Sequence, residues 1–204
     1  MYNRPRIIPV LLIDDRDMVK TVRFKDPTYL GDPINAVKIF NRKEVDELSI
    51  LDISATKRGR EPDFAELKDI ASEHFMALSY GGGISRIEQV RELVGIGYEK
   101  VVINSALVRD PSLVEHAAEM FGAQSIVASI DAKLVKGGYH CVICGGQETI
   151  GLSPLDLAKK AEALGVGEIL INSVDNDGGM KGYDIGLVKG VSSAVTIPVT
   201  ACGG

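Results

Sequence analysis

One half-length repeat constrains this chain more than any other feature. The segment 76–83, MALSYGGG, resembles 197–204, IPVTACGG, and the segment 46–53, DELSILDI, resembles 167–174, GEILINSV. Both pairs are offset by 121 residues. Each unit has the pattern of a buried strand, so the repeat predicts a barrel of two duplicated halves. Two copies would need about 242 residues, so we expect this chain of 204 residues to lack the last strand–helix unit.

The composition predicts one globular domain over residues 1–204. Hydrophobic residues make up 45% of the chain and charged residues 25%, and no Pro/Ser-rich linker interrupts it. The net charge of −5 argues against a sequence-independent nucleic-acid binder, and no apolar run approaches the ~20 residues of a membrane helix. Three cysteines, an odd and sparse set, suit a reducing compartment. We therefore expect a cytoplasmic protein that binds neither nucleic acid nor membrane.

Apolar runs and helix-period segments alternate along the chain. Helix starts are predicted at Asp32-Pro33, Pro62, Pro111-Ser112 and Ser153-Pro154, and the glycine-rich segment 134–150 predicts a β-hairpin. The predicted strands are 6–12, 46–52, 76–80, 99–104, 125–131, 167–172 and 197–202. Their Val/Ile/Leu content is typical of parallel strands covered on both faces. Together with the repeat, these steps favour an α/β (β/α)₈ barrel without its eighth unit over an open doubly wound sheet.

The cysteines do not predict a metal site. Cys141 and Cys144 form a single C-x-x-C beside His140, with no second pair of ligands elsewhere. We interpret them as small apolar thiols in the hairpin and expect neither a metal nor another cofactor.

Polar residues and glycines gather where the predicted strands end, which is the catalytic face of a (β/α)₈ barrel. Glycines there let backbone N–H groups approach a phosphate. Two glycine loops at the offset of the repeat predict two phosphate sites on opposite sides of the mouth, and the alternative is that they are only tight turns. The strand-end residues are Asp52, Gly81-Gly82-Gly83, Asn104-Ser105, Asp131, Asp175, Asp177 and Gly203-Gly204.

Asp131 is the candidate general acid or base. It closes an apolar strand, and the period of two places it on the face of Val127 and Ser129. The alternative role is that of an aspartate that holds loop amides.

Four charges stand at strand starts: Arg6, Glu47, Lys100 and Glu168. If their faces point inward, two cations and two anions meet at the bottom of the barrel, where they must pair because unpaired buried charges are costly. Such a ring would be a structural plug or a gate across an axial passage. The remaining alternative is that each charge faces solvent.

Together these residues resemble the cyclase subunit of imidazole glycerol phosphate synthase, a barrel of the histidine pathway. The resemblance covers the whole chain. It rests on motifs that include Gly31-Asp32-Pro33, Lys100-Val101-Val102-Ile103-Asn104, Ser129-Ile130-Asp131, Gly167-Glu168-Ile169-Leu170 and Lys181-Gly182-Tyr183-Asp184. It implies that a glutaminase docks on the bottom face and that ammonia passes through the four-charge gate to a substrate with two phosphates at the top.

The resemblance also implies roles for further residues. The catalytic candidates are Asp131, Asp52, Asp177, Lys20 and the residue at position 12. The phosphate- or substrate-binding candidates are Gly82, Gly83, Asn104, Ser105, Gly178, Gly203 and Gly204.

The chain departs from the family at position 12. The cyclases use one aspartate at the end of strand 1 and one after strand 5, but the first position holds Leu12, which carries no proton. Asp14 or Asp15 replaces it only if the strand end slips. The surrounding segments, Pro9-Val10-Leu11-Leu12 and Lys20-Thr21-Val22-Arg23-Phe24, resemble a paralogue group that serves the amidation of surface-polysaccharide sugars. We therefore expect an ammonia conduit for a sugar amidotransferase; the alternatives are the histidine-pathway cyclase and an inert assembly partner.

Overall fold

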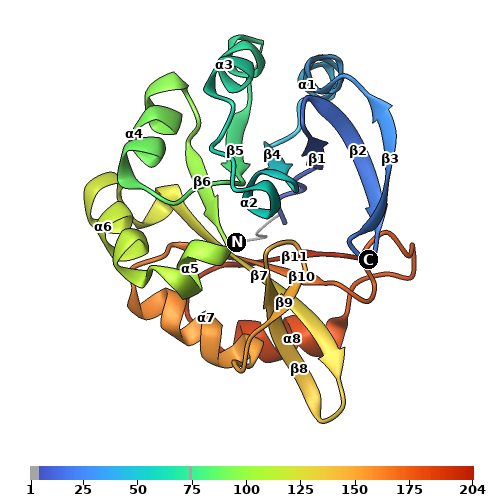
Figure 1. The fold of residues 1–204 in the computed structure, drawn as a ribbon, viewed down its shortest axis with the longest axis vertical. Coiled ribbons are helices and arrows are strands. Elements are labelled where there is room, and N and C mark those ends of the chain that lie inside the picture. Colours follow the sequence, from blue (N-terminus) through green and yellow to red (C-terminus); the bar gives the residue numbers. More distant parts are fainter. Residues whose placement is uncertain (1–4, 74) are drawn as a thin grey trace.

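A computed structural model describes residues 5–73 and 75–204 as an α/β fold, in which a curled and mainly parallel sheet is surrounded by helices (Figure 1). The strands are β1 (Val10–Asp14), β2 (Asp17–Val22), β3 (Lys25–Gly31), β4 (Glu47–Asp52), β5 (Ala77–Gly81), β6 (Lys100–Ile103), β7 (Ile126–Val135), β8 (Gly138–Ile143), β9 (Glu148–Thr149), β10 (Glu168–Ser173) and β11 (Val199–Cys202). The helices are α1 (Pro33–Arg42), α2 (Ala55–Arg58), α3 (Phe64–Ser72), α4 (Ile87–Ile96), α5 (Ser105–Arg109), α6 (Pro111–Phe121), α7 (Pro154–Ala163) and α8 (Ile185–Ala194), with the 3₁₀ turn η1 (Ala123–Ser125).

The order of the strands is that of a (β/α)₈-type barrel. The parallel neighbours run β11-β10-β7-β6-β5-β4-β1, so sequential β/α units lie side by side. β2 and β3 extend the sheet beyond β1 as an antiparallel hairpin, and β8 folds back on β7. Among the described residues, β1 and β11 do not pair with each other. This topology agrees with the predicted barrel rather than with an open doubly wound sheet.

Capping residues explain where the helices begin. The Asp32 side chain accepts from the N–H of Asn35, Ser153 from Asp156, and Asp110 from Leu113, each with a proline at the first helical position. The helix predicted to start at Pro62 begins at Phe64 instead, because Asp63 provides the cap by accepting from the Glu66 N–H.

Two parts of the sequence prediction were wrong in detail. The first strand lies at Val10–Asp14 and not at 6–12, and the hairpin β2–β3 was not predicted. β2 alternates buried Val19 and Thr21 with exposed Lys20 and Val22, which is a two-residue period typical of a strand with one covered face. The predicted hairpin in 134–150 is confirmed by β8 and β9.

Successive side chains of each parallel strand point to opposite faces of the sheet, so the strands contribute to two separate hydrophobic cores. One set of side chains packs under the helices, as Val101 and Ile103 do on β6, while Val102 points to the inside of the curled sheet. There Val102 packs with Val127 and Leu170. The inner side therefore carries the residues predicted to face the barrel interior. No helix within the described ranges has the length and apolarity needed to span a membrane.

Candidate functional site

A cavity of about 590 Å³ opens where the parallel strands end, at the catalytic face of such a barrel. It brings together most of the predicted site residues from loops far apart in the sequence. Those that line it are Leu12, Asp52, Gly82, Gly83, Asn104, Ser105, Asp131 and Asp177.

Asp131 lies in the wall of this mouth cavity and is only 8% exposed. The Asn104 Nδ2 donates to Asp131 Oδ2 at 3.2 Å and to the Ser129 carbonyl at 3.0 Å. Burial and the nearby charge of Asp177 raise the pKa of Asp131 to about 7, although hydrogen bonding from Asn172 and the charge of Lys57 act in the opposite direction. The carboxyl group is therefore suited to exchange a proton near neutral pH.

The end of strand 1 provides no second carboxylate. Leu12 pairs in register with Leu51 and lines the mouth cavity, so the strand has not slipped. Asp14 and Asp15 lie outside the lining and form ion pairs with Arg58, at 2.9 and 2.6 Å. Neither aspartate therefore offers a carboxylate to the mouth cavity.

The other predicted catalytic residues have different surroundings. Asp52 Oδ1 accepts from the N–H groups of Ser54 and Ala55, both at 2.8 Å, so this carboxylate organises the loop into α2. Half-buried Asp177 accepts from the Thr21 hydroxyl at 3.4 Å, and burial raises its pKa. Lys20 is exposed on β2 and lines neither of the two cavities described here, so the structure does not bring it to the site.

The glycines after β5 and β11 are required by close packing. Gly82 has φ +134°, and a Cβ there would lie 2.6 Å from the Asp52 carbonyl oxygen. Gly203 has φ +77°, and a Cβ there would lie 2.2 Å from Asn172 Oδ1. Both turns thus fit the alternative interpretation of the motif, in which the glycines are required by tight turns, and of the two only the turn after β5 lines the mouth cavity. Gly178, Gly203 and Gly204 line the interior cavity rather than the mouth cavity.

Gly203→Ala is expected to lower the free energy of unfolding by about 1–3 kcal/mol, because both the left-handed backbone and the contact with Asn172 oppose a side chain. Urea unfolding measures the effect. Gly151→Ala is the matched control, since a Cβ at Gly151 meets nothing within 4 Å. Equal stabilities of the two variants would contradict the prediction.

Sequence reasoning missed three cations that also line the mouth cavity: Lys57, Arg60 and Arg109. Arg109 is paired with Glu148 at 2.7 Å, and Arg60 forms an ion pair with Asp15. Within the described ranges, the Lys57 ammonium group makes no salt bridge or hydrogen bond, and its influence on Asp131 is electrostatic. The basic run TKRGR, residues 56–60, begins four residues after the end of the predicted strand 46–52 and was the signal that could have identified Lys57 and Arg60.

The four charges predicted at strand starts do face inward and form a closed ion-paired ring. Glu47 Oε2 accepts from Arg6 at 2.8 Å and from Lys100 at 2.7 Å, and Glu168 accepts from the same two cations at 2.7 and 2.8 Å. The carboxylates are buried and Lys100 nearly so, whereas the Arg6 side chain is 41% exposed. The alternative in which each charge faces solvent is therefore wrong.

Removing Lys100 should be destabilising. Lys100→Met leaves two buried carboxylates with only Arg6 between them, so we expect the free energy of unfolding to fall by about 3 kcal/mol. The control is Arg16→Met, which breaks the exposed Arg16–Asp63 pair and should cost less than about 1 kcal/mol. Denaturant unfolding of both variants at one salt concentration makes the comparison, and a Lys100→Met variant as stable as wild type would contradict it.

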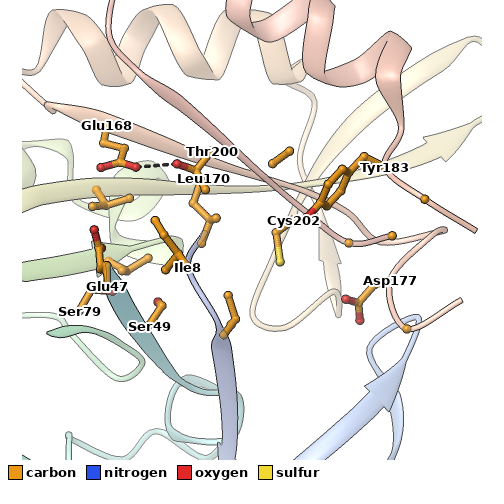
Figure 2. Close-up of a pocket in the computed structure, with 18 of the residues that line it drawn as sticks. Ile8, Glu47, Ser49, Ser79, Glu168, Leu170, Asp177, Tyr183, Thr200 and Cys202 are labelled. Atoms are coloured by element: carbon orange, nitrogen blue, oxygen red, sulfur yellow. Dashed lines mark hydrogen bonds between the residues drawn. The ribbon is translucent and has the colours of Figure 1, made fainter. Parts of the chain in front are cut away.

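A second cavity, of about 580 Å³, lies inside the curled sheet. Figure 2 shows Glu47 and Glu168 of the ring at one end and Asp177 and Tyr183 at the other. Residues of β1 and of β11 line it. The two cavities adjoin, because both are lined by Val10, Val102, Asp177 and Cys202. The ring and the mouth therefore border neighbouring cavities that share part of their lining.

Comparison with known proteins supports the family suggested by the sequence. Residues 6–204 match the family described as "Histidine biosynthesis protein". A Pseudomonas aeruginosa protein provisionally named imidazole glycerol phosphate synthase subunit hisF2 is 48% identical over 202 residues, which cover 98% of this chain and 80% of that protein. A Leptospira interrogans protein, provisionally named as subunit HisF, is 45% identical over 203 residues, with coverage of 98% and 80%. For a Vibrio vulnificus protein provisionally named hisF3, the identity is 44% and the coverage 98% and 78%. The chain belongs to the histidine biosynthesis protein family, among relatives named as imidazole glycerol phosphate synthase subunits.

Proposed function

We propose that this chain is the barrel subunit of a cytoplasmic, glutamine-dependent amidotransferase complex. A glutaminase partner releases ammonia at the bottom face, and the barrel conducts it to the mouth. The observation that carries the proposal is the ion-paired ring at one end of an interior cavity that adjoins the mouth cavity. A ring that served only as a plug would not require open space behind it.

The lining of the interior cavity suits a small neutral molecule. Val102, Val127 and Leu170 form an apolar section that disfavours ammonium, because an ion loses its hydration there, and admits neutral ammonia far more readily. Ser49 lines the same cavity, is 4% exposed, and its Oγ has no hydrogen-bond partner within the described residues. A passing N–H group would satisfy this buried hydroxyl.

Two acceptors of the nitrogen remain as candidates. The names of the relatives favour the histidine-pathway reaction, in which ammonia is added to a bisphosphorylated ribonucleotide. Leu12 favours transfer to a sugar held by a separate amidating enzyme, because the mouth lacks one of two proton-transfer groups. In either case Gly82, Asn104 and Ser105 are the proposed phosphate-binding residues of the mouth. An inert assembly partner is the third candidate and predicts no nitrogen transfer.

The test follows the nitrogen atom. The full chain is combined with its glutaminase and supplied with amide-¹⁵N glutamine in an excess of unlabelled ammonium. The acceptor is the bisphosphorylated ribonucleotide in one arm, and in the other a nucleotide-linked sugar with the amidating enzyme. Product that carries mainly ¹⁵N supports conduction, and the arm that forms it identifies the acceptor. Product labelled only in proportion to bulk ammonium would refute the conduit.

A further inference from the structure

Thr200 joins the ring as a fifth member. It lies on β11, lines the interior cavity, and its Oγ1 donates a hydrogen bond of 2.6 Å to Glu168 Oε1, drawn as a dashed line in Figure 2. The same oxygen accepts from Arg6, and Glu168 Oε2 accepts from Lys100. Both oxygens of Glu168 are thus occupied, by three donors.

Glu47 is held differently. Arg6 and Lys100 both donate to its Oε2, at 2.8 and 2.7 Å. Its Oε1 receives no hydrogen bond from the described residues, although Ser49 and Ser79 line the cavity nearby. The two carboxylates carry the same formal charge and similar burial, but Glu168 has one more donor than Glu47.

We propose that Thr200 is a positioning residue that fixes Glu168 as the immobile side of the ring, so that the ring opens at Glu47. The inference rests on the proposed ammonia conduction for its purpose. Displacing the Glu47 side chain breaks two hydrogen bonds, both to one oxygen, whereas displacing the Glu168 side chain breaks three. When the two cations move away, Thr200 still holds Glu168 in place, while no other hydrogen bond from the described residues holds Glu47.

The ionisation of Glu168 agrees with this role. Burial opposes the charged form, but hydrogen bonds from Lys100 and Thr200 and the charge of Lys100 outweigh burial and lower the pKa of Glu168. Without the Thr200 hydroxyl, each glutamate would keep two contacts, and the ring would have no preferred side of opening.

Three variants test the proposal on the full chain. Thr200→Val removes the hydroxyl at nearly constant volume, and Thr200→Ser should restore the bond. Thr196→Val is the matched control: Thr196 Oγ1 also donates at 2.6 Å to a glutamate, Glu162, but on the outer surface. NMR titration of ¹³C-labelled glutamate carboxylates should show the pKa of Glu168 raised by about 0.5–1 in Thr200→Val and unchanged in Thr200→Ser and Thr196→Val.

Relaxation dispersion of the same carboxylates tests the side of opening. In wild type and Thr200→Ser we expect conformational exchange of the Glu47 carboxylate and none of the Glu168 carboxylate. In Thr200→Val we expect conformational exchange of both carboxylates. An unchanged Glu168 titration in Thr200→Val, or wild-type exchange at Glu168, would overturn the assignment. In the ¹⁵N assay, Thr200→Val should lower the glutamine-derived share of product about two-fold or more. If wild type itself fails to channel nitrogen, the proposed function fails, while the NMR measurements still decide the role of Thr200.

Discussion

Supplied with free ammonia and the histidine-pathway ribonucleotide, this protein is expected to form cyclised product about 10²–10⁴-fold more slowly than a cyclase with a strand-1 aspartate. The reason is Leu12, which lines the mouth cavity at the position of that aspartate. Asp14 and Asp15 do not compensate, because both are paired with Arg58 outside the cavity lining. A steady-state turnover assay at saturating ammonia measures the effect, and a rate close to that of the cyclases would contradict it.

Leu12→Asp is the informative companion variant. Leu12 pairs with Leu51 in the parallel register and with Val19 in the hairpin, so a new carboxylate enters an apolar neighbourhood that raises its pKa. We therefore expect at most partial recovery of cyclisation, and measurement from pH 6 to 9 shows whether any recovery follows ionisation of the new group. Leu12→Asn, of the same size and without a charge, controls for disturbed packing.

Much of the fold was predictable because it depends on local patterns. Buried Val/Ile/Leu runs identified the parallel strands to within a few residues, and Asp-Pro or Ser-Pro pairs identified helix starts that the caps at Asp32 and Ser153 confirm. The first strand was predicted to begin too early. Ile7 and Ile8 continue the apolar run of this strand in the sequence, but the pairing of β1 with β4 begins only at Val10. The small helices α2 and α5 lie in loops that no long period marks. The duplication of the two halves stays a prediction, although Glu47 and Glu168, one offset apart, occupy equivalent places in the ring.

The candidate site was predictable where a residue stands at a strand end and less so elsewhere. Strand parity placed Asp131 on the face of Val127 and Ser129, and Lys100 on the face of Asn104, but it left open whether these faces point inward. The ion pairs of the ring show that its charges face inward, and Arg6 reaches the ring from a segment that precedes β1. Parity gave no information on Lys57, which lies in the short helix α2, or on the hydrogen bond of Thr200, which in the sequence looks like any other strand residue. Which donor meets which carboxylate oxygen depends on the curl of the sheet, which no local pattern encodes.

Asp131→Asn is expected to make the protein more stable at pH 8 and to leave it nearly unchanged near pH 4. The pKa of Asp131 is raised to about 7 in the folded protein, against about 3.9 in an unfolded chain. Its protonated form therefore stabilises the fold below the unfolded pKa, and that stability is lost as the pH rises through about 7. Asparagine carries no charge at any pH, so the variant does not lose this stability. The free energy of unfolding of Asp131→Asn should therefore exceed that of the wild type by about 4 kcal/mol at pH 8.

Urea unfolding at pH 4.5, 6 and 8 measures this difference, and a gap that does not change with pH would contradict the prediction. Asp15→Asn is the control of opposite sign: hydrogen bonding from Arg58 lowers the pKa of Asp15, so loss of the Asp15 carboxylate should weaken the fold at neutral pH.

The same Asp131→Asn variant also tests function. If the barrel only conducts ammonia to a partner's substrate, product formation in the complex should largely persist. Complete loss of product, with folding and glutaminase activity intact, would show that Asp131 acts directly on the acceptor and would restore the cyclase as the better interpretation.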